Sequence, residues 1–247
     1  MNDTLTRKAA LLVQYNSGRK WEGTFAEYVL IPARYVIRIP EELSLRDEVI
    51  APILCGGVTA YKALKVSNVT PGKWIAVLGA AGGVGALAIQ YARAMGYRVL
   101  AVDISSEKAN FCRELGAEAY LDVAHTDDFP ERVSEVTSGQ DASCVLVIAG
   151  SSKAYELGLK ILAPFGVLTC VGIPPANQLA TFHPLLFIDK GIRIIGSAVG
   201  TRKDILEALS FVERGLVIPS ITLTSLEGLT EITQFSGAVN GKYVVKF

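Results

Sequence analysis

A glycine-rich run at residues 79–85 has the residue types and the setting to bind a phosphate group. The run, Gly79-Ala-Ala-Gly-Gly-Val-Gly85, follows the apolar stretch Trp74-Ile-Ala-Val-Leu78 and precedes a helical pattern over 86–95. Glycines in that setting allow a tight turn and bring backbone N–H groups close to a pyrophosphate at the positive end of a helix. A glycine cluster alone is weak evidence, because ordinary turns also use glycine for steric reasons.

Asp103 strengthens the interpretation, because it ends the next predicted strand, 24 positions after Gly79. A ribose-binding carboxylate is expected at about that spacing. It accepts hydrogen bonds from both adenosine ribose hydroxyls and would repel a 2′-phosphate, and Ile104-Ser-Ser106 supplies no arginine for such a phosphate. We therefore expect NAD(H) rather than NADP(H). Lys108 is placed to reach the ribose, although a solvated surface lysine is an equally good interpretation of its position.

Metal and thiol chemistry have few candidate residues in this chain, which has four cysteines and two histidines. There is no Cys-x-x-Cys pair, so neither a disulfide framework nor a zinc knuckle is indicated. The scarcity of histidine also limits acid–base hypotheses. The residues are Cys55, Cys112, Cys144, Cys170, His125 and His183.

The segment Tyr61-Lys-Ala-Leu-Lys65 has the Tyr-x-x-x-Lys spacing of the acid–base pair in short-chain dehydrogenases. In that family the pair lies late in the nucleotide-binding unit, whereas here it precedes the first predicted strand of the unit. We therefore interpret the spacing as a coincidence.

The order of predicted elements indicates an α/β fold, a doubly wound parallel sheet of the Rossmann type. Continuous apolar strands alternate with helices, as expected of a parallel sheet covered on both faces. A small β-rich region is expected over the first fifty residues, with strands at 24–31 and 35–39. A capping-box-like start at Ser44 predicts a helix toward Leu54, and a second helix follows at 58–65. The later strands are predicted at 74–78, 98–103, 119–122, 142–149, 166–172, 193–199 and 243–247. The later helices are predicted at 86–95, between the strand at 98–103 and residue 115, and at 127–137, 155–162 and 204–214.

Composition restricts the class of partner. Half of the residues are hydrophobic, and 24 basic residues balance 24 acidic ones. No global field would recruit nucleic acid or an acidic membrane, and the longest apolar runs are too short to span a bilayer. We expect a compact, soluble, cytoplasmic protein that binds a small-molecule substrate.

Taken together, the motifs resemble the zinc-dependent alcohol dehydrogenases of the medium-chain dehydrogenase/reductase superfamily, the fungal enzymes in particular. The resemblance runs from about residue 23 to residue 245. It divides the chain into a remnant of the GroES-like catalytic domain (1–50), a Rossmann dinucleotide-binding domain (51–215) and a segment returning to the remnant (216–247). The matching motifs are Gly23-Thr-Phe-Ala-Glu-Tyr28, Ala51-Pro-Ile-Leu-Cys-Gly-Gly-Val-Thr-Ala-Tyr-Lys-Ala-Leu64, Leu78-Gly-Ala-Ala-Gly-Gly-Val-Gly85, Tyr91-Ala-Arg-Ala-Met-Gly-Tyr-Arg-Val99, Val171-Gly-Ile-Pro174, Gly196-Ser-Ala-Val-Gly-Thr-Arg202 and Lys242-Tyr-Val-Val245.

The resemblance also implies a set of cofactor contacts. Lys242 matches an arginine that contacts the pyrophosphate in the family, and lysine keeps the charge but loses the bidentate fork. The adenosine diphosphate half would be held by Gly79, Ala81, Gly82, Gly83, Val84, Gly85, Asp103 and Lys108. The nicotinamide end would be lined by Val171, Ile173, Ser197 and Val199.

The chain departs from the family at its front. The family places a substantial catalytic region ahead of the segment that matches Gly23, and this region carries the other zinc ligands. Cys55 matches the remaining catalytic-zinc cysteine, but catalytic zinc needs about three protein ligands. We therefore expect no zinc and interpret Cys55 as a vestigial small residue. No catalytic residue is predicted.

Four hypotheses follow. The first is a zinc-independent NAD(H)-linked oxidoreductase that acts on a small or apolar metabolite. The second is a pseudo-dehydrogenase repurposed as a cyclase, isomerase or metabolite-binding protein through an exposed apolar cleft. The third is a structural partner, because the family dimerises through the sheet edge near 193–199. A shortened gene model is the fourth.

Overall fold

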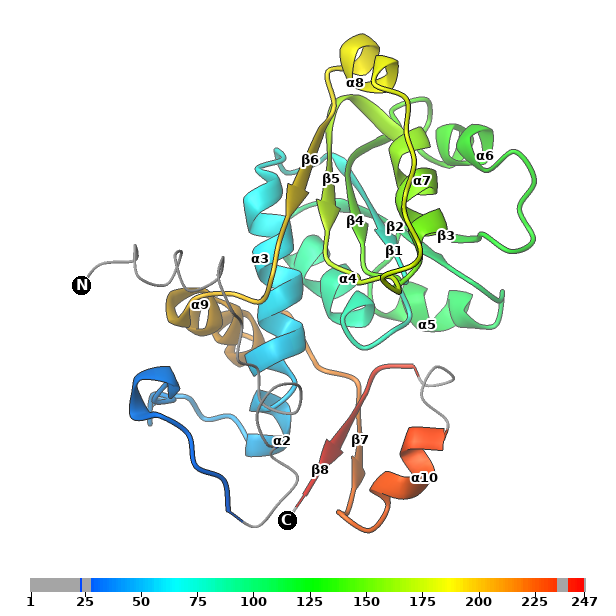
Figure 1. The fold of residues 1–247 in the computed structure, drawn as a ribbon. Helices are drawn as coiled ribbons and strands as arrows, with labels where there is room; N and C mark the ends of the chain where they lie inside the picture. The colour runs from blue at the N-terminus through cyan, green and yellow to red at the C-terminus, as the bar shows by residue number, and fades with distance from the viewer. Residues whose placement is uncertain (1–22, 24–27, 235–239, 247) are drawn as a thin grey trace.

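The computed structural model describes residue 23, residues 28–234 and residues 240–246 of the chain. Its centre is a six-stranded sheet with strand order β3-β2-β1-β4-β5-β6 (Figure 1), and every neighbouring pair is parallel. This is the doubly wound sheet predicted from the sequence. The strands are β1 Trp74–Leu78, β2 Arg98–Asp103, β3 Ala119–Asp122, β4 Ala142–Val147, β5 Leu162–Cys170 and β6 Arg193–Gly196.

Helices cover both faces of the sheet, because alternate strand residues are apolar on each side. Ile75 and Val77 of β1 belong to one apolar core, and Trp74 and Leu78 belong to the other. The first core includes residues of α3, α4, α5 and α9, and the second includes residues of α6, α7 and α8. The helices are α3 Val58–Ser67, α4 Gly85–Ala94, α5 Lys108–Glu114, α6 Phe129–Val136, α7 Ser152–Lys160, α8 Leu185–Lys190 and α9 Arg202–Glu213.

The carboxyl ends of β2, β1 and β4 lie side by side, because β1 pairs with β2 on one edge and with β4 on the other. The connections that follow β1 and β4 lead to opposite sides of the sheet, so a crevice is expected at the carboxyl end of β1. The glycine-rich run and Asp103 both follow strands that end there.

The structure differs from the sequence expectation before residue 50. Residues 24–27 of the first predicted strand lie outside the described residues, and residues 28–46 contain only a short 3-10 helix, η1 Ala33–Tyr35. An isolated extended segment leaves its backbone groups unpaired, and the described chain supplies it with no neighbouring strand. The side chains of Tyr28 and Leu30 are accordingly exposed. The β-rich remnant is therefore not formed in the described part of this segment.

The first helical region begins at Asp47 rather than at Ser44, and Arg46 at its N-cap makes no side-chain capping bond. Helix α2 Asp47–Ile50 leads into a π-helical turn, η2 Ile53–Gly57, and then into α3. This helical run is apolar and long enough to cross a membrane by composition, but 61% of that window is buried inside the protein. It has the burial of a core helix.

The end of the chain forms a separate parallel ribbon of β7 Ile221–Thr224 and β8 Lys242–Val245, with α10 Leu229–Gln234 between them in sequence. A strand had been predicted at 243–247, and the observed strand begins one residue earlier. The backbone N–H of Gly241, just before β8, lies 3.3 Å from the carbonyl oxygen of Ala81. The end of the chain therefore lies against the glycine-rich run.

Candidate functional site

The glycine-rich run makes the tight turn predicted for it. Gly79 has φ +86°, and a Cβ at this position would lie 2.9 Å from the backbone nitrogen of Ala149. A Cβ at Gly85, the first residue of α4, would lie 2.6 Å from the carbonyl oxygen of Ala80 and still closer to that of Gly79. Glycine is therefore required at both positions for steric reasons.

Asp103 lies beside this turn and is held by three donors. Its Oδ2 accepts a hydrogen bond of 2.8 Å from the backbone N–H of Ala81. Its Oδ1 accepts bonds of 2.8 Å from the N–H of Ile104 and from the ammonium of Lys108. The structure thus brings Asp103, Lys108 and the glycine-rich run together, as the sequence predicted, and Lys108 is an ion-pair partner of Asp103 rather than a solvated lysine.

A cavity of about 430 Å3 opens at the carboxyl ends of β1, β2 and β4. That volume is within the usual range of small-molecule sites, and most of its wall is apolar. Sequence reasoning located only Gly79 and Asp103 among its residues. The others could have been found from the rule that parallel strands bind ligands at their carboxyl ends. The wall consists of Leu78, Gly79, Val102, Asp103, Ile104, Val123, Ala149, Ser151, Lys153, Ala154 and Leu157.

Lys242 lies against the glycine-rich run, as the resemblance implied. A Cβ at Gly83 would lie 2.5 Å from Lys242 Cγ and 2.9 Å from the carbonyl oxygen of Gly241. A Cβ at Gly56 would lie 2.5 Å from Lys242 Cε and 3.0 Å from its Nζ. The stem of Lys242 therefore runs between two glycines, and its ammonium can face an anion at the N-terminus of α4.

The four residues predicted at the nicotinamide end follow β5 and β6. The N–H of Val171 bonds to Val147 and that of Ser197 to Cys170, so both continue their strands. Ile173 is 78% exposed, and Val199 is 44% exposed with φ +46°, which a β-branched residue rarely adopts. The hydroxyl of Ser197 is buried without a hydrogen-bond partner in the described part of the chain.

Comparison with known proteins places this architecture in a family. A family model described as zinc-binding dehydrogenase matches residues 83–214, more than half of the chain. An alcohol dehydrogenase of Geobacillus stearothermophilus is 40% identical over 236 residues, covering 94% of this chain and 67% of that protein. The chain belongs to the zinc-binding dehydrogenase family. The family resemblance predicted from the sequence motifs is thus confirmed.

Two further members support the assignment to this family. Alcohol dehydrogenase 1 of Neurospora crassa is 40% identical over 235 residues, covering 93% of this chain and 65% of its own length. The crystal structure of the alcohol dehydrogenase of Aeropyrum pernix superposes with a TM-score of 0.83 at 26% identity, covering 93% of this chain and 67% of that one. The chain therefore spans about two thirds of the length of its relatives in the zinc-binding dehydrogenase family.

Cys55, which the resemblance matched to a zinc-binding cysteine, lies in the π-helical turn before α3. Cys112 and Cys144 are buried in the same apolar core, the one that includes α3, α4, α5 and α9, and burial raises their thiol pKa values. His125 pairs with Asp122, its Nδ1 lying 2.8 Å from Oδ2. Within the described residues, no group of three His, Cys, Asp or Glu side chains that could hold a metal ion lies together.

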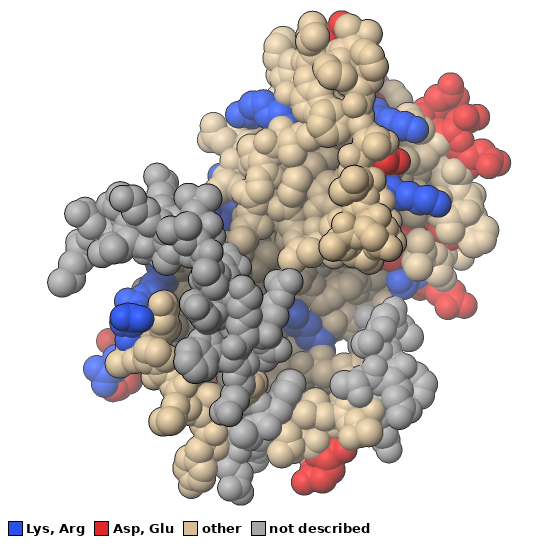
Figure 2. Space-filling model, in the orientation of Figure 1, with Lys and Arg blue, Asp and Glu red and all other residues tan. Residues whose placement is uncertain are grey.

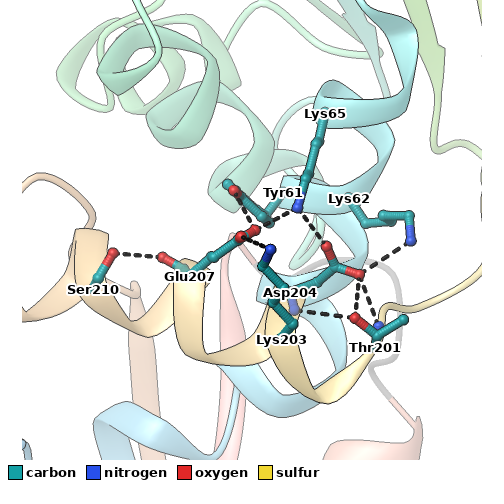
Figure 3. Close-up of polar contacts among 8 residues, drawn as sticks. All are labelled: Tyr61, Lys62, Lys65, Thr201, Lys203, Asp204, Glu207 and Ser210. Atoms are coloured by element: carbon teal, nitrogen blue, oxygen red, sulfur yellow. Dashed lines mark hydrogen bonds and ion pairs between the residues drawn. The ribbon is translucent and has the colours of Figure 1, made fainter. Parts of the chain in front are cut away.

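Tyr61 and Lys65 lie on α3, and their side chains point toward Glu207 and Asp204 of α9 (Figure 3). Tyr61 donates a 2.9 Å hydrogen bond to Glu207, and Lys65 pairs with both Glu207 and Asp204. Burial, reinforced by the bond to Glu207, raises the pKa of Tyr61 to about 12. A proton donor near neutral pH needs a pKa closer to 7, so this geometry supports the interpretation that the spacing is a coincidence.

Asp204 links the two helices and gives a first prediction. It accepts hydrogen bonds from Lys62 at 3.0 Å, Lys65 at 2.9 Å and the capping residue Thr201. Burial of the side chain raises the pKa of Asp204, but these bonds outweigh burial and lower it well below its usual range. Replacing Asp204 by asparagine is expected to reduce the free energy of unfolding by about 2 kcal/mol at neutral pH.

The pH dependence of this effect has a definite sign. Because the pKa of Asp204 is lowered on folding, its contribution is present above the unfolded value of about 3.9 and is lost as pH falls through the folded value. Urea denaturation should therefore show the difference between wild type and Asp204→Asn shrinking below about pH 4. The control is Glu41→Gln, which removes the exposed pair with Arg38 and should change little. A difference that is constant with pH would contradict the assignment.

Proposed function

We propose that this alcohol dehydrogenase-like chain is an NAD(H)-linked oxidoreductase that acts on a small or apolar metabolite without catalytic zinc, in the cytoplasm. The observation that carries the proposal is the contact of Asp103 with the N–H of Ala81. It holds a carboxylate at the wall of the cavity and beside the turn at the N-terminus of α4. Ribose and pyrophosphate would therefore bind next to one another.

The residues present fit the adenosine diphosphate half of this cofactor. Ala81, Ile104 and Lys108 take three of the about four lone-pair positions of Asp103, so its Oδ2 would accept a hydrogen bond from one ribose hydroxyl. Gly82 leaves room for a pyrophosphate to approach the backbone, since a Cβ there would have only the carbonyl oxygen of Gly79 within 4 Å, at 3.6 Å, and Lys242 would offset its charge. A 2′-phosphate would meet the carboxylate of Asp103, which supports NAD(H) over NADP(H).

NAD(H) would supply or accept a hydride when bound. At the nicotinamide end, the buried hydroxyl of Ser197 has no hydrogen-bond partner in the described chain. This supports a hydrogen bond from Ser197 to a bound molecule. Ile173 and Val199 would provide an apolar surface for the substrate. Reduction of an electron-poor alkene, imine or quinone is the reaction class we propose, because hydride transfer to such acceptors needs no Lewis acid.

The test measures NADH binding by calorimetry and then NADH oxidation with a panel of quinones, activated alkenes and imines. We expect binding, a preference over NADPH, and turnover that is equal with and without a strong chelator. Absence of NADH binding would overturn the cofactor. Activity lost to the chelator and restored by zinc would overturn zinc independence.

The exposure of Ile173 and Val199 also favours a second candidate function. An open apolar surface of this kind could bind a metabolite for a cyclisation, for an isomerisation or for binding alone. This pseudo-dehydrogenase proposal predicts conversion or binding of an apolar metabolite with no change in NADH absorbance. Stoichiometric NADH oxidation would contradict it.

We also propose that a second copy of the chain pairs along β6. This strand lies at the edge of the sheet, and its Ile194 is 40% exposed. The surface over β6 and α8 is largely uncharged in the view of Figure 2. Unpaired edges of this kind are available for strand pairing. Light scattering during gel filtration should give a dimer, and a strict monomer would contradict the proposal.

A further inference from the structure

Lys153 lines the cavity on the side opposite Asp103 in the strand order. It lies in the first turn of α7, which follows β4, whereas Asp103 ends β2. Strands β2 and β4 flank β1 in the sheet. The cavity wall therefore carries a carboxylate on one side of β1 and an ammonium group on the other.

The two charges differ in what compensates them. Asp103 is neutralised by Lys108, at 2.8 Å. Lys153 is exposed, makes no ion pair or side-chain hydrogen bond within the described chain, and through its charge helps to lower the pKa of Glu156 on its own helix. The acid of its own helix, Glu156, accepts two bonds of 3.0 Å from Thr181, which lower its carboxyl pKa. The ammonium donors of Lys153 are thus left for a ligand.

The remaining wall defines what kind of ligand group belongs there. It is predominantly apolar, so it suits a flat ring that carries hydrogen-bond acceptors and no positive charge. The adenine base has both properties, since its ring nitrogens are acceptors. The apolar wall residues are Leu78, Val102, Ile104, Val123, Ala149, Ala154 and Leu157.

We propose that Lys153 donates a hydrogen bond from its ammonium to a ring nitrogen of the adenine base, an assignment that rests on the proposed NAD(H) site. The bond is charge-assisted, so it is stronger than a hydrogen bond between neutral groups. Lys153 thereby contributes affinity for the adenine base, whereas Asp103 favours NAD(H) over NADP(H) at the ribose. Nothing in the glycine-rich run supplies a comparable contact to the base.

The test compares Lys153→Met with the matched control Lys160→Met, at the other end of α7 and outside the cavity wall. Methionine keeps an unbranched apolar stem and removes the donors. Calorimetry with NADH and ADP-ribose, and a competition assay with adenosine, should each show about ten-fold weaker binding to Lys153→Met. Nicotinamide mononucleotide, which lacks the base, should bind equally to both variants and to wild type.

Each outcome has a distinct meaning. Equal binding of ADP-ribose by Lys153→Met and wild type would overturn the assignment and leave the cofactor site intact. A loss seen with ADP-ribose but not with adenosine would overturn it in favour of a phosphate contact. Failure of wild type to bind NADH and ADP-ribose would overturn the proposed function as well.

Discussion

Replacing Gly85 by alanine is expected to abolish NADH binding and to lower the free energy of unfolding by about 3 kcal/mol or more. The added Cβ would lie 2.6 Å from the carbonyl oxygen of Ala80, and closer still to that of Gly79. Both are backbone atoms of the same turn, which is anchored by the N–H groups of Gly79 and Ala80 on the carbonyl of Val102. The turn cannot move away from the new methyl group without breaking those bonds.

Gly82→Ala is the matched control, because it adds the same methyl group three residues earlier. Its Cβ would lie 3.6 Å from the carbonyl oxygen of Gly79, an ordinary contact, and the backbone there needs no positive φ. We expect a change in unfolding free energy below about 1 kcal/mol. Urea denaturation of both variants tests the steric pair, and NADH titration tests the loss of binding by Gly85→Ala. Equal destabilisation by the two substitutions would contradict the steric argument.

Asp103→Asn is expected to weaken NADH binding about 100-fold, roughly the loss of one strong charge-assisted hydrogen bond. Asparagine is close to isosteric, but it removes the charge that would hold a ribose hydroxyl and that now pairs with Lys108. It also removes the repulsion that excludes a 2′-phosphate, and it frees the ammonium of Lys108. NADPH binding should therefore improve relative to NADH binding.

The control for this substitution is Asp122→Asn at the register position next to Asp103 in the neighbouring strand. Asp122 accepts bonds from the N–H groups of Ser105 at 3.1 Å and Ala124 at 3.0 Å, and it does not line the cavity. Asparagine retains an acceptor for these donors. We expect NADH affinity within about three-fold of wild type. Similar losses for the two variants, measured by titration with NADH and NADPH, would contradict a specific role for Asp103.

These predictions separate cofactor binding from the reaction. The proposed adenosine half of the site consists of described residues of this chain, and each contact can be removed singly. The substrate end depends on Ile173, Ser197 and Val199, which lie at the open edge of the described structure. The chain covers about two thirds of the length of its relatives in the family. Substrate identity is therefore the question that the enzymatic screen addresses.

The nucleotide-binding unit could be predicted from the sequence because its signals are local. Apolar strand, glycine turn and helix follow one another within about twenty residues, and each is determined by periodicity or by glycine's backbone freedom. Asp103 was found for the same reason, since one helix and one strand determine its distance from Gly79. The strands predicted before residue 50 are not formed in the described residues of this segment. A strand also needs a partner strand, which alternating residues such as Ile37 and Ile39 cannot specify.

Tertiary structure decided the contacts between residues that are distant in the chain. It placed Lys242 against Gly83, paired Lys65 with Asp204 and Glu207, and brought Lys153 to the cavity that Asp103 lines. Local spacing does not determine the contacts of these lysines, because the contacts arise from strand order and helix packing. The sequence thus determined by itself that a dinucleotide-binding turn forms. The folded chain determined which charges surround it, because only folding sets the distances over which charges act.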